Sequence, residues 1–285
     1  MLRNALQPWI RRILAAFWLL RLSRSLPVAA VTGVGALAAG ASASAMLAAI
    51  LGGWLLAVGS LSLELYTERE FDAAARRRRN PLAEGSLQPS TGLAISILFI
   101  LGSLVVISRI PWAVVPWLAS LAIVAAMARR LLEASLLRAL ALGLLLALYV
   151  ILGGLAGQMS AAVWLLSGAY LFAGAGGCSA ASVRDLRGAP TTPKPSLALC
   201  YGMACSAGWA AAGLVAAVAL GLAVYATRLF GALYLYFALA AAALGLGMAG
   251  WLAARPSPRL AGALVPLGLA CLGGLNALAV ILGRL

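Results

Sequence analysis

The chain contains no histidine, and its 285 residues include only seven acidic side chains. The absence of histidine excludes acid–base catalysis by imidazole, metal sites with histidine ligands and haem held by an axial histidine. Only 10% of the residues are charged and 64% are apolar, so a water-soluble domain would have too little polar surface to cover itself. The composition therefore predicts a membrane protein.

Cysteine is also scarce, and its spacing carries no motif. The four cysteines lack the CxxC spacing of metal or redox sites, and at least Cys200, Cys205 and Cys271 lie inside apolar runs. Small apolar packing residues are the interpretation that this pattern favours. Neither a disulfide framework nor a cysteine metal site is indicated.

The formal net charge is +14, from 21 basic and seven acidic residues. Such an excess is often a sign of nucleic-acid binding, but here the basic residues are sparse and separate long apolar runs. This distribution is typical of membrane topology. Membrane lipids are the expected partners, and no nucleic acid is expected.

Apolar runs long enough to cross a bilayer divide the chain. A crossing needs about 20 residues, because the hydrocarbon core is about 30 Å thick and a helix rises about 1.5 Å per residue. The predicted fold class is all-α: a polytopic membrane protein with nine transmembrane helices around a central cavity. The expected spans are roughly 26–42, 46–66, 91–108, 110–128, 137–156, 161–177, 196–221, 230–253 and 260–283.

The basic residues predict the orientation of these spans. With nine crossings, every Lys and Arg falls on one side of the membrane except Arg109, Arg228 and Arg284. Because basic loops stay in the cytoplasm, the N-terminus is expected to be cytoplasmic and the C-terminus external. The expected localisation is a multi-pass protein of the inner (cytoplasmic) membrane, with its active side facing the cytoplasm.

Two regions are expected. Residues 1–25 form an N-terminal interfacial segment, because the apolar stretch Ile13–Leu20 is too short to cross a bilayer and would place Trp9, Phe17 and Trp18 among the headgroups. A signal peptide is the alternative for this stretch. Residues 26–285 form a single transmembrane helical domain with polar cytoplasmic loops at 67–90 and 178–195.

All seven carboxylates lie on the same side as the arginines, although topology does not require this. Glu64, Glu68 and Asp72 follow one another at intervals of four residues, so a continuous helix would place them in one acidic stripe. Stacked like charges repel and require a cation. The nearby arginines in an ion-pair network, or a hard divalent metal such as Mg²⁺, would each meet this need.

Two polar loops flank the proposed cavity. Arg76–Arg79 are suited to a diphosphate, which takes bidentate donors and neutralising charge, although a basic cytoplasmic loop is also what topology requires. Asp185 lies in a second polar loop on the same predicted membrane face. Facing loops of this kind can close over one central cavity.

These residues resemble a known family. Tyr66–Asp72, followed by an arginine run and Asn80-Pro81-Leu82-Ala83-Glu84-Gly85, is similar to the first Asp-rich signature of the UbiA superfamily of intramembrane prenyltransferases. The second loop, with Asp185, Gly188 and Thr191-Thr192, is similar in position to the second signature. Glu64 and Glu68 stand where the family has Asn and Asp, and Asn80 stands in place of an arginine.

The resemblance implies a prenyltransferase that moves a prenyl group from a polyprenyl diphosphate to a lipid-soluble acceptor, an aromatic one being favoured. Mg²⁺ would assist ionisation to an allylic cation, and an apolar, aromatic-lined cavity would keep water away. Ser182 and Ala189 occupy expected carboxylate positions, so three alternatives stay open: a reduced metal set, basic residues that replace part of the metal's role, or lost catalysis. The alternative functions are a binding or transport protein that kept the cavity, and a UbiA-type terpene cyclase.

The resemblance assigns a role to each candidate site residue. The catalytic candidates are Glu68, Asp72 and Asp185, and the metal candidates are these three with Glu64. The candidate diphosphate-binding residues are Arg76, Arg79, Arg130, Arg184, Arg187 and Lys194. The candidate cavity-lining residues are Tyr66, Phe71, Tyr170 and Phe172.

Overall fold

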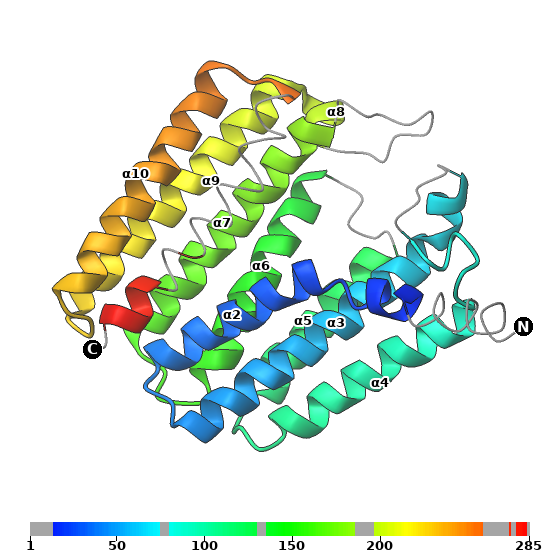
Figure 1. The fold of residues 1–285 in the computed structure, drawn as a ribbon. Coiled ribbons are helices and arrows are strands. Elements are labelled where there is room, and N and C mark those ends of the chain that lie inside the picture. The colour runs from blue at the N-terminus through cyan, green and yellow to red at the C-terminus, as the bar shows by residue number, and fades with distance from the viewer. Residues whose placement is uncertain are drawn as a thin grey trace, which may run out of the picture.

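The computed structural model describes residues 14–74, 80–129, 135–185, 197–258, 274 and 278–283. These ranges contain helices and connecting turns and no β-strand, so the all-α prediction is confirmed for them (Figure 1). In chain order the main helices are α2 (Leu22–Ala38), α3 (Ala43–Ala74), α4 (Pro89–Ile107), α5 (Val114–Ala128), α6 (Ser135–Gly154), α7 (Ala161–Asp185), α8 (Leu197–Tyr201), α9 (Met203–Ala223) and α10 (Ala232–Ala254).

Six of these helices are long and apolar enough to cross a membrane: α3, α4, α6, α7, α9 and α10. The helices α2 and α5 are apolar but have only 17 and 15 residues. The ninth expected span, 260–283, lies outside the described residues except for 274 and 278–283. The structure thus bears out a multi-pass helical membrane protein, while the count of nine crossings and the cytoplasmic N-terminus stay predictions.

Helix α3 is longer than a single crossing needs. It runs for 32 residues, to Ala74, so it extends beyond the predicted span end at residue 66 into the region expected to be a polar loop. No proline or glycine interrupts it between Ser60 and Ala74. Glu64, Glu68 and Asp72 therefore lie on one continuous helix, spaced about one turn apart.

The predicted span 196–221 is divided. Gly202 has a φ of 86°, a backbone conformation that side-chain-bearing residues rarely adopt, and it separates the five-residue α8 from α9. The sequence pattern did not indicate this break, because the residues on both sides of the glycine are apolar.

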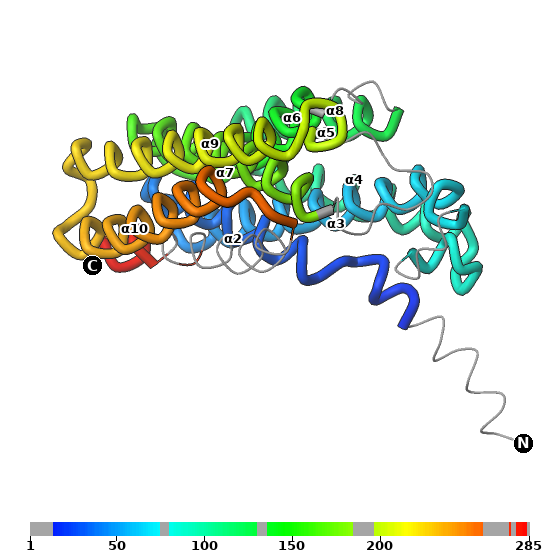
Figure 2. The backbone as a smooth tube through the Cα atoms, turned by 90° about the horizontal axis from the view of Figure 1, so that it is seen from above, coloured from blue at the N-terminus to red at the C-terminus, as the bar shows by residue number. Residues whose placement is uncertain are grey.

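Helices α6, α7 and α9 pack at very short distances. The contacts are made by glycines: Gly143 of α6 faces Gly174 of α7, and Gly176 of α7 faces Gly213 of α9. Seen from above, α6 and α9 lie along one side of the molecule and α2 and α10 along the other (Figure 2). Small residues allow such close approach of helices in a membrane, where apolar burial supplies little drive for association.

A short helical stretch precedes α2 and has two different faces. Ala15 and Leu19 are buried against Leu65, Leu82 and Leu87. Phe17 and Trp18 on the opposite face are 57% and 68% exposed. This two-sided stretch is compatible with the interfacial segment expected from the sequence, whose contact with a membrane surface stays a prediction.

Candidate functional site

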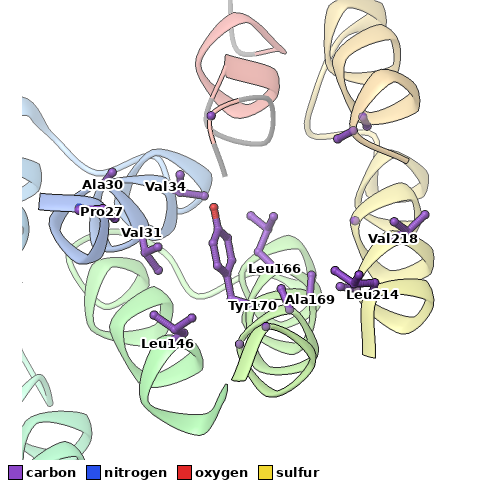
Figure 3. A pocket seen from close by; sticks show the side chains of 18 of the residues that line it. Pro27, Ala30, Val31, Val34, Leu146, Leu166, Ala169, Tyr170, Leu214 and Val218 are labelled. Carbon is purple, nitrogen blue, oxygen red and sulfur yellow. The ribbon is translucent and has the colours of Figure 1, made fainter. Parts of the chain in front are cut away.

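The helices α2, α6, α7, α9 and α10 enclose a cavity of about 550 Å³. Its wall is almost entirely apolar and consists of aliphatic side chains and small residues such as Ala169, Ala173 and Gly174. Figure 3 shows Tyr170 projecting from α7 between Val34 of α2 and Leu166. A cavity of this size and polarity suits an apolar ligand, since such sites bury most of the surface of a bound small molecule.

Of the four aromatic residues expected to line the cavity, only Tyr170 does so. Tyr66 lies under the guanidinium of Arg69, with 4.5 Å between Cζ and the ring centroid. Phe71 is half-buried on α3, and Phe172 is 39% exposed on the outer face of α7. Aromatic walls were expected from the sequence, whereas the signal that marks the cavity is the run of small residues Ala173-Gly174-Ala175-Gly176-Gly177, which leaves space.

Charged side chains gather at one end of this cavity. Arg21 donates a hydrogen bond to Glu64, with 2.8 Å between Nη1 and Oε2. Arg138 of α6 approaches two acidic residues of α3, with its Nη2 3.9 Å from Glu64 Oε1 and 3.8 Å from Glu68 Oε1. Arg24 interacts electrostatically with Arg21, Arg184, Glu64 and Glu68. We call Arg21, Arg24, Glu64, Glu68, Arg138 and Arg184 the mouth cluster.

Helix periodicity connects the mouth cluster to the cavity. Arg24 precedes the lining residues Val28 and Val31 of α2 by four and seven positions. On α6, Arg138 precedes the lining residue Leu142 by four positions. Because residues three, four and seven positions apart share one face of a helix, these arginines lie on the cavity side, one turn beyond the apolar wall.

The same relation holds on α7. Arg184 follows the lining residues Gly177 and Ala173 by seven and eleven positions, which again corresponds to one helix face. Three separate helices thus each carry an arginine beyond the apolar wall. The cavity has an apolar body and a cationic mouth.

The mouth cluster carries more positive than negative charge. As defined, the cluster contains four guanidinium groups and two carboxylates, so its formal charge is positive. Like charges held together at the edge of a low-dielectric cavity repel, so an anion bound among them would stabilise the arrangement. The geometry therefore favours an amphiphilic ligand with an apolar tail and an anionic head.

Asp72 occupies a different environment from the two glutamates. It is 5% exposed, and its Oδ2 accepts a hydrogen bond of 3.0 Å from Asn80 Nδ2. The same amide donates to the Leu65 carbonyl oxygen, and its Oδ1 accepts from the Leu82 N–H. Asn80 thus joins the turn after α3 to the side of that helix, and Asp72 is part of this junction.

Replacing Asn80 by alanine should destabilise the protein by about 1–3 kcal/mol, because it removes three hydrogen bonds of a side chain that is 1% exposed and one of them reaches a carboxylate. Thermal unfolding in detergent measures the effect. Ser86→Ala in the same turn is the control: its hydroxyl is exposed and makes one hydrogen bond, to the Pro81 carbonyl oxygen, so we expect a loss below about 1 kcal/mol. Equal losses in the two variants would contradict the junction assigned to Asn80.

The other predicted site residues lie at the ends of the described segments. Arg184 is in the last turn of α7, and Asp185 is its final residue, with a side chain outside the described part. The structure therefore brings Glu64 and Glu68 together with Arg184 but leaves the side chain of Asp185 unplaced. The predicted diphosphate ligands that lie outside the described residues are Arg76, Arg79, Arg130, Arg187 and Lys194.

The carboxylates of α3 do not form a metal cage in the described part of the chain. Glu64 is occupied by Arg21 and Arg138, Glu68 shares Arg138, and Asp72 accepts from Asn80. The described residues contain no group of three acidic or cysteine side chains placed to hold one ion. A Mg²⁺ site requires several oxygen ligands at short, nearly octahedral positions, and this arrangement does not fit one.

Comparison with known proteins identifies relatives of the chain. The sequence model of the UbiA prenyltransferase family matches residues 25–264. A comparison with curated proteins gives no match.

Solved structures match over nearly the whole chain. A digeranylgeranylglyceryl phosphate synthase superposes with a TM-score of 0.79 at 19% identity, over 96% of this chain and 98% of the other. A UbiA homologue from Aeropyrum pernix K1 gives 0.70 at 19% identity, over 86% and 95%. A UbiA homologue from Archaeoglobus fulgidus bound to DMAPP and Mg²⁺ gives 0.69 at 15% identity, over 96% and 99%. At these identities the likeness establishes the fold.

Proposed function

The chain belongs to the UbiA prenyltransferase family, and from this premise we propose that it transfers a prenyl group from a prenyl diphosphate to a lipid-soluble acceptor. The observation that carries the proposal is the apolar cavity of about 550 Å³ with arginines at its mouth. A prenyl diphosphate has the same two parts, a hydrocarbon tail and an anionic head. Its tail would lie between α2, α7 and α9, and its head among the arginines.

The transfer begins with cleavage of the bond between the first prenyl carbon and the bridging oxygen. The bonding electron pair leaves with the diphosphate, and an allylic cation remains. A nucleophilic atom of the acceptor then forms a bond to the first prenyl carbon and loses a proton, so the products are the prenylated acceptor and protonated diphosphate. An aromatic acceptor supplies such a nucleophile from its π-electrons, which agrees with the preference implied by the family resemblance.

Two properties of this chain's own residues would assist the cleavage. Arg24, Arg138 and Arg184 would stabilise the charge that develops on the departing diphosphate, because donors fixed in place at a poorly solvated site act strongly on developing charge. The apolar wall would exclude water that could otherwise capture the cation. The ring of Tyr170 supplies a π-face inside the cavity, which attracts a cation.

The role of Mg²⁺ in this chain stays a prediction. Structures of the Archaeoglobus fulgidus UbiA homologue contain Mg²⁺ together with DMAPP or GPP. The sequence predicts Glu64, Glu68, Asp72 and Asp185 as ligands, but the described carboxylates do not fit the ion, so no step of the transfer is assigned to it. The pairing of Glu64 with Arg21 and Arg138 removes one of the four ligands expected from the sequence.

The remaining assignments extend the same proposal. Residues 26–285 would act as one transmembrane domain in the cytoplasmic membrane, and residues 1–25 would lie on its surface. The mouth cluster would face the cytoplasm, because it includes the basic residues that the positive-inside rule places there. A water-soluble diphosphate would then enter from the cytoplasm, while the acceptor would reach the cavity from the lipid.

A direct test uses purified protein in detergent with labelled geranyl, farnesyl or geranylgeranyl diphosphate, Mg²⁺ and a panel of lipid-soluble aromatic acceptors. We expect an acceptor-dependent labelled product that extracts into organic solvent. Labelled hydrocarbon formed without an acceptor would indicate the terpene cyclase instead. Saturable binding with no product for any acceptor would support the binding or transport alternative and contradict the proposed transfer.

A further inference from the structure

We propose that the mouth cluster binds the diphosphate of the substrate through guanidinium groups without a divalent metal. This inference rests on the proposed function and deepens it, because it states how this chain recognises the charged end of a prenyl diphosphate. A metal site would need the carboxylates of α3 as ligands, but the described glutamates of this helix are paired with arginines instead.

Glu64 is paired with two arginines of the mouth cluster. Both of its carboxylate oxygens face guanidinium groups, Oε2 at 2.8 Å from Arg21 and Oε1 at 3.9 Å from Arg138. A carboxylate that accepts a hydrogen bond from one guanidinium and is ion-paired with a second is electrostatically satisfied and holds both cations in place. Glu64 therefore acts as a positioning residue for the arginines.

Arg138 and Arg24 have guanidinium groups that can bind a ligand. Arg138 is 3.8–3.9 Å from its two carboxylate partners, which is beyond the usual hydrogen-bond distance for N–H and oxygen. The Arg138 guanidinium makes no side-chain hydrogen bond within the described ranges. The Arg24 guanidinium, at the mouth, likewise donates to no described acceptor. These two guanidinium groups keep N–H donors for the oxygens of an anion.

The mouth cluster has a positive formal charge, and it lies one turn beyond the apolar wall on α2 and α6 and about two turns beyond it on α7. A diphosphate offers several anionic oxygens in the geometry that guanidinium groups bind in bidentate fashion. The cluster thus supplies the positive charge that Mg²⁺ provides in a metal-dependent site. It also supplies N–H donors that hold the diphosphate oxygens.

The test measures binding of the non-cleavable analogue farnesyl thiolodiphosphate to the wild-type protein, once in Mg²⁺ and once in excess EDTA. We expect saturable binding in both, with dissociation constants that differ by less than about tenfold, since the arginines stay in place. Binding in Mg²⁺ that disappears in EDTA would overturn the inference and leave the proposed function intact. No binding in either condition would count against the proposed function itself.

Two variants locate the binding groups. Arg138→Gln and Arg24→Gln should each raise the dissociation constant in EDTA by about tenfold or more, because each loses a charge-assisted hydrogen bond. Arg109→Gln is the matched control: Arg109 is exposed in the turn between α4 and α5, on the other predicted side of the membrane, and its loss should not change binding. Melting temperatures of all three variants show that they are folded. Unchanged affinity in both mouth variants would overturn the inference.

Discussion

Ala173→Phe should lower turnover of geranylgeranyl diphosphate by about 10- to 100-fold. Ala173 lines the cavity on α7, beside Tyr170, and a phenyl ring at this position would occupy space that the proposed prenyl tail needs. Overfilling a packed apolar site costs about 1–3 kcal/mol, which corresponds to this range of rates when the cost falls on the transition state. The loss should be smaller for dimethylallyl diphosphate, whose short tail leaves most of the cavity empty.

The measurement is the ratio of kcat/KM between the long and the short substrate. Ala240→Phe is the control, because Ala240 is exposed on α10 and does not line the cavity, so the same substitution should leave the ratio unchanged. Equal losses for both substrates in Ala173→Phe would indicate damage to the mouth or the fold. That result would contradict the placement of the tail in this cavity.

Gly153→Leu should destabilise the protein by about 3 kcal/mol or prevent folding. A Cβ atom at Gly153 of α6 would collide with the carbonyl oxygen of Thr32 on α2, and backbone atoms cannot turn aside as a flexible side chain can. A Cβ atom at Gly35 of α2 would likewise collide with the Val150 carbonyl oxygen of α6. Each of the two helices therefore contributes a glycine to the crossing. Any larger residue must therefore push α2 away from α6.

The comparison variant is Gly250→Leu. Gly250 lies on α10, where no atom of a described residue is within 4 Å of an added Cβ, so nothing in the described part of the chain opposes a larger side chain there. We expect its melting temperature to equal or exceed that of the wild type, because glycine inside a helix costs roughly 0.5–1 kcal/mol relative to alanine. Similar melting temperatures for the two variants would contradict the close crossing of α2 and α6. Because α2 and α6 both line the cavity, partial separation should also weaken substrate binding.

The helical membrane fold followed from the sequence, because the length and polarity of apolar runs are set by the bilayer. The runs that became α3, α4, α6, α7, α9 and α10 were each visible as stretches of low charge. Their boundaries were less secure, as Gly202 and the extension of α3 to Ala74 show. Helix ends depend on local backbone geometry and on side chains from other segments, and hydropathy reports neither.

The candidate site was predictable only in part. The spacing of Glu64, Glu68 and Asp72 indicated one helical face, and the structure places them on one continuous helix. The spacing could not decide between a metal and arginine partners, because the partners come from residues 43 and 74 positions away along the chain, Arg21 and Arg138. The aromatic walls were expected from the family resemblance, but burial of a ring depends on which face its helix turns to the cavity.

The sequence by itself determined that this is a multi-pass helical membrane protein, and it predicts the side on which the charges lie. Both are properties of composition and order along the chain: apolar length sets the crossings, and the loops collect the arginines. Only the tertiary structure decided that Glu64 and Glu68 are paired with guanidinium groups and that the cavity is walled by small residues. The physical reason is that ion pairing and empty space depend on distances between different helices, and these distances are set by how closely the glycine-lined faces of the helices pack.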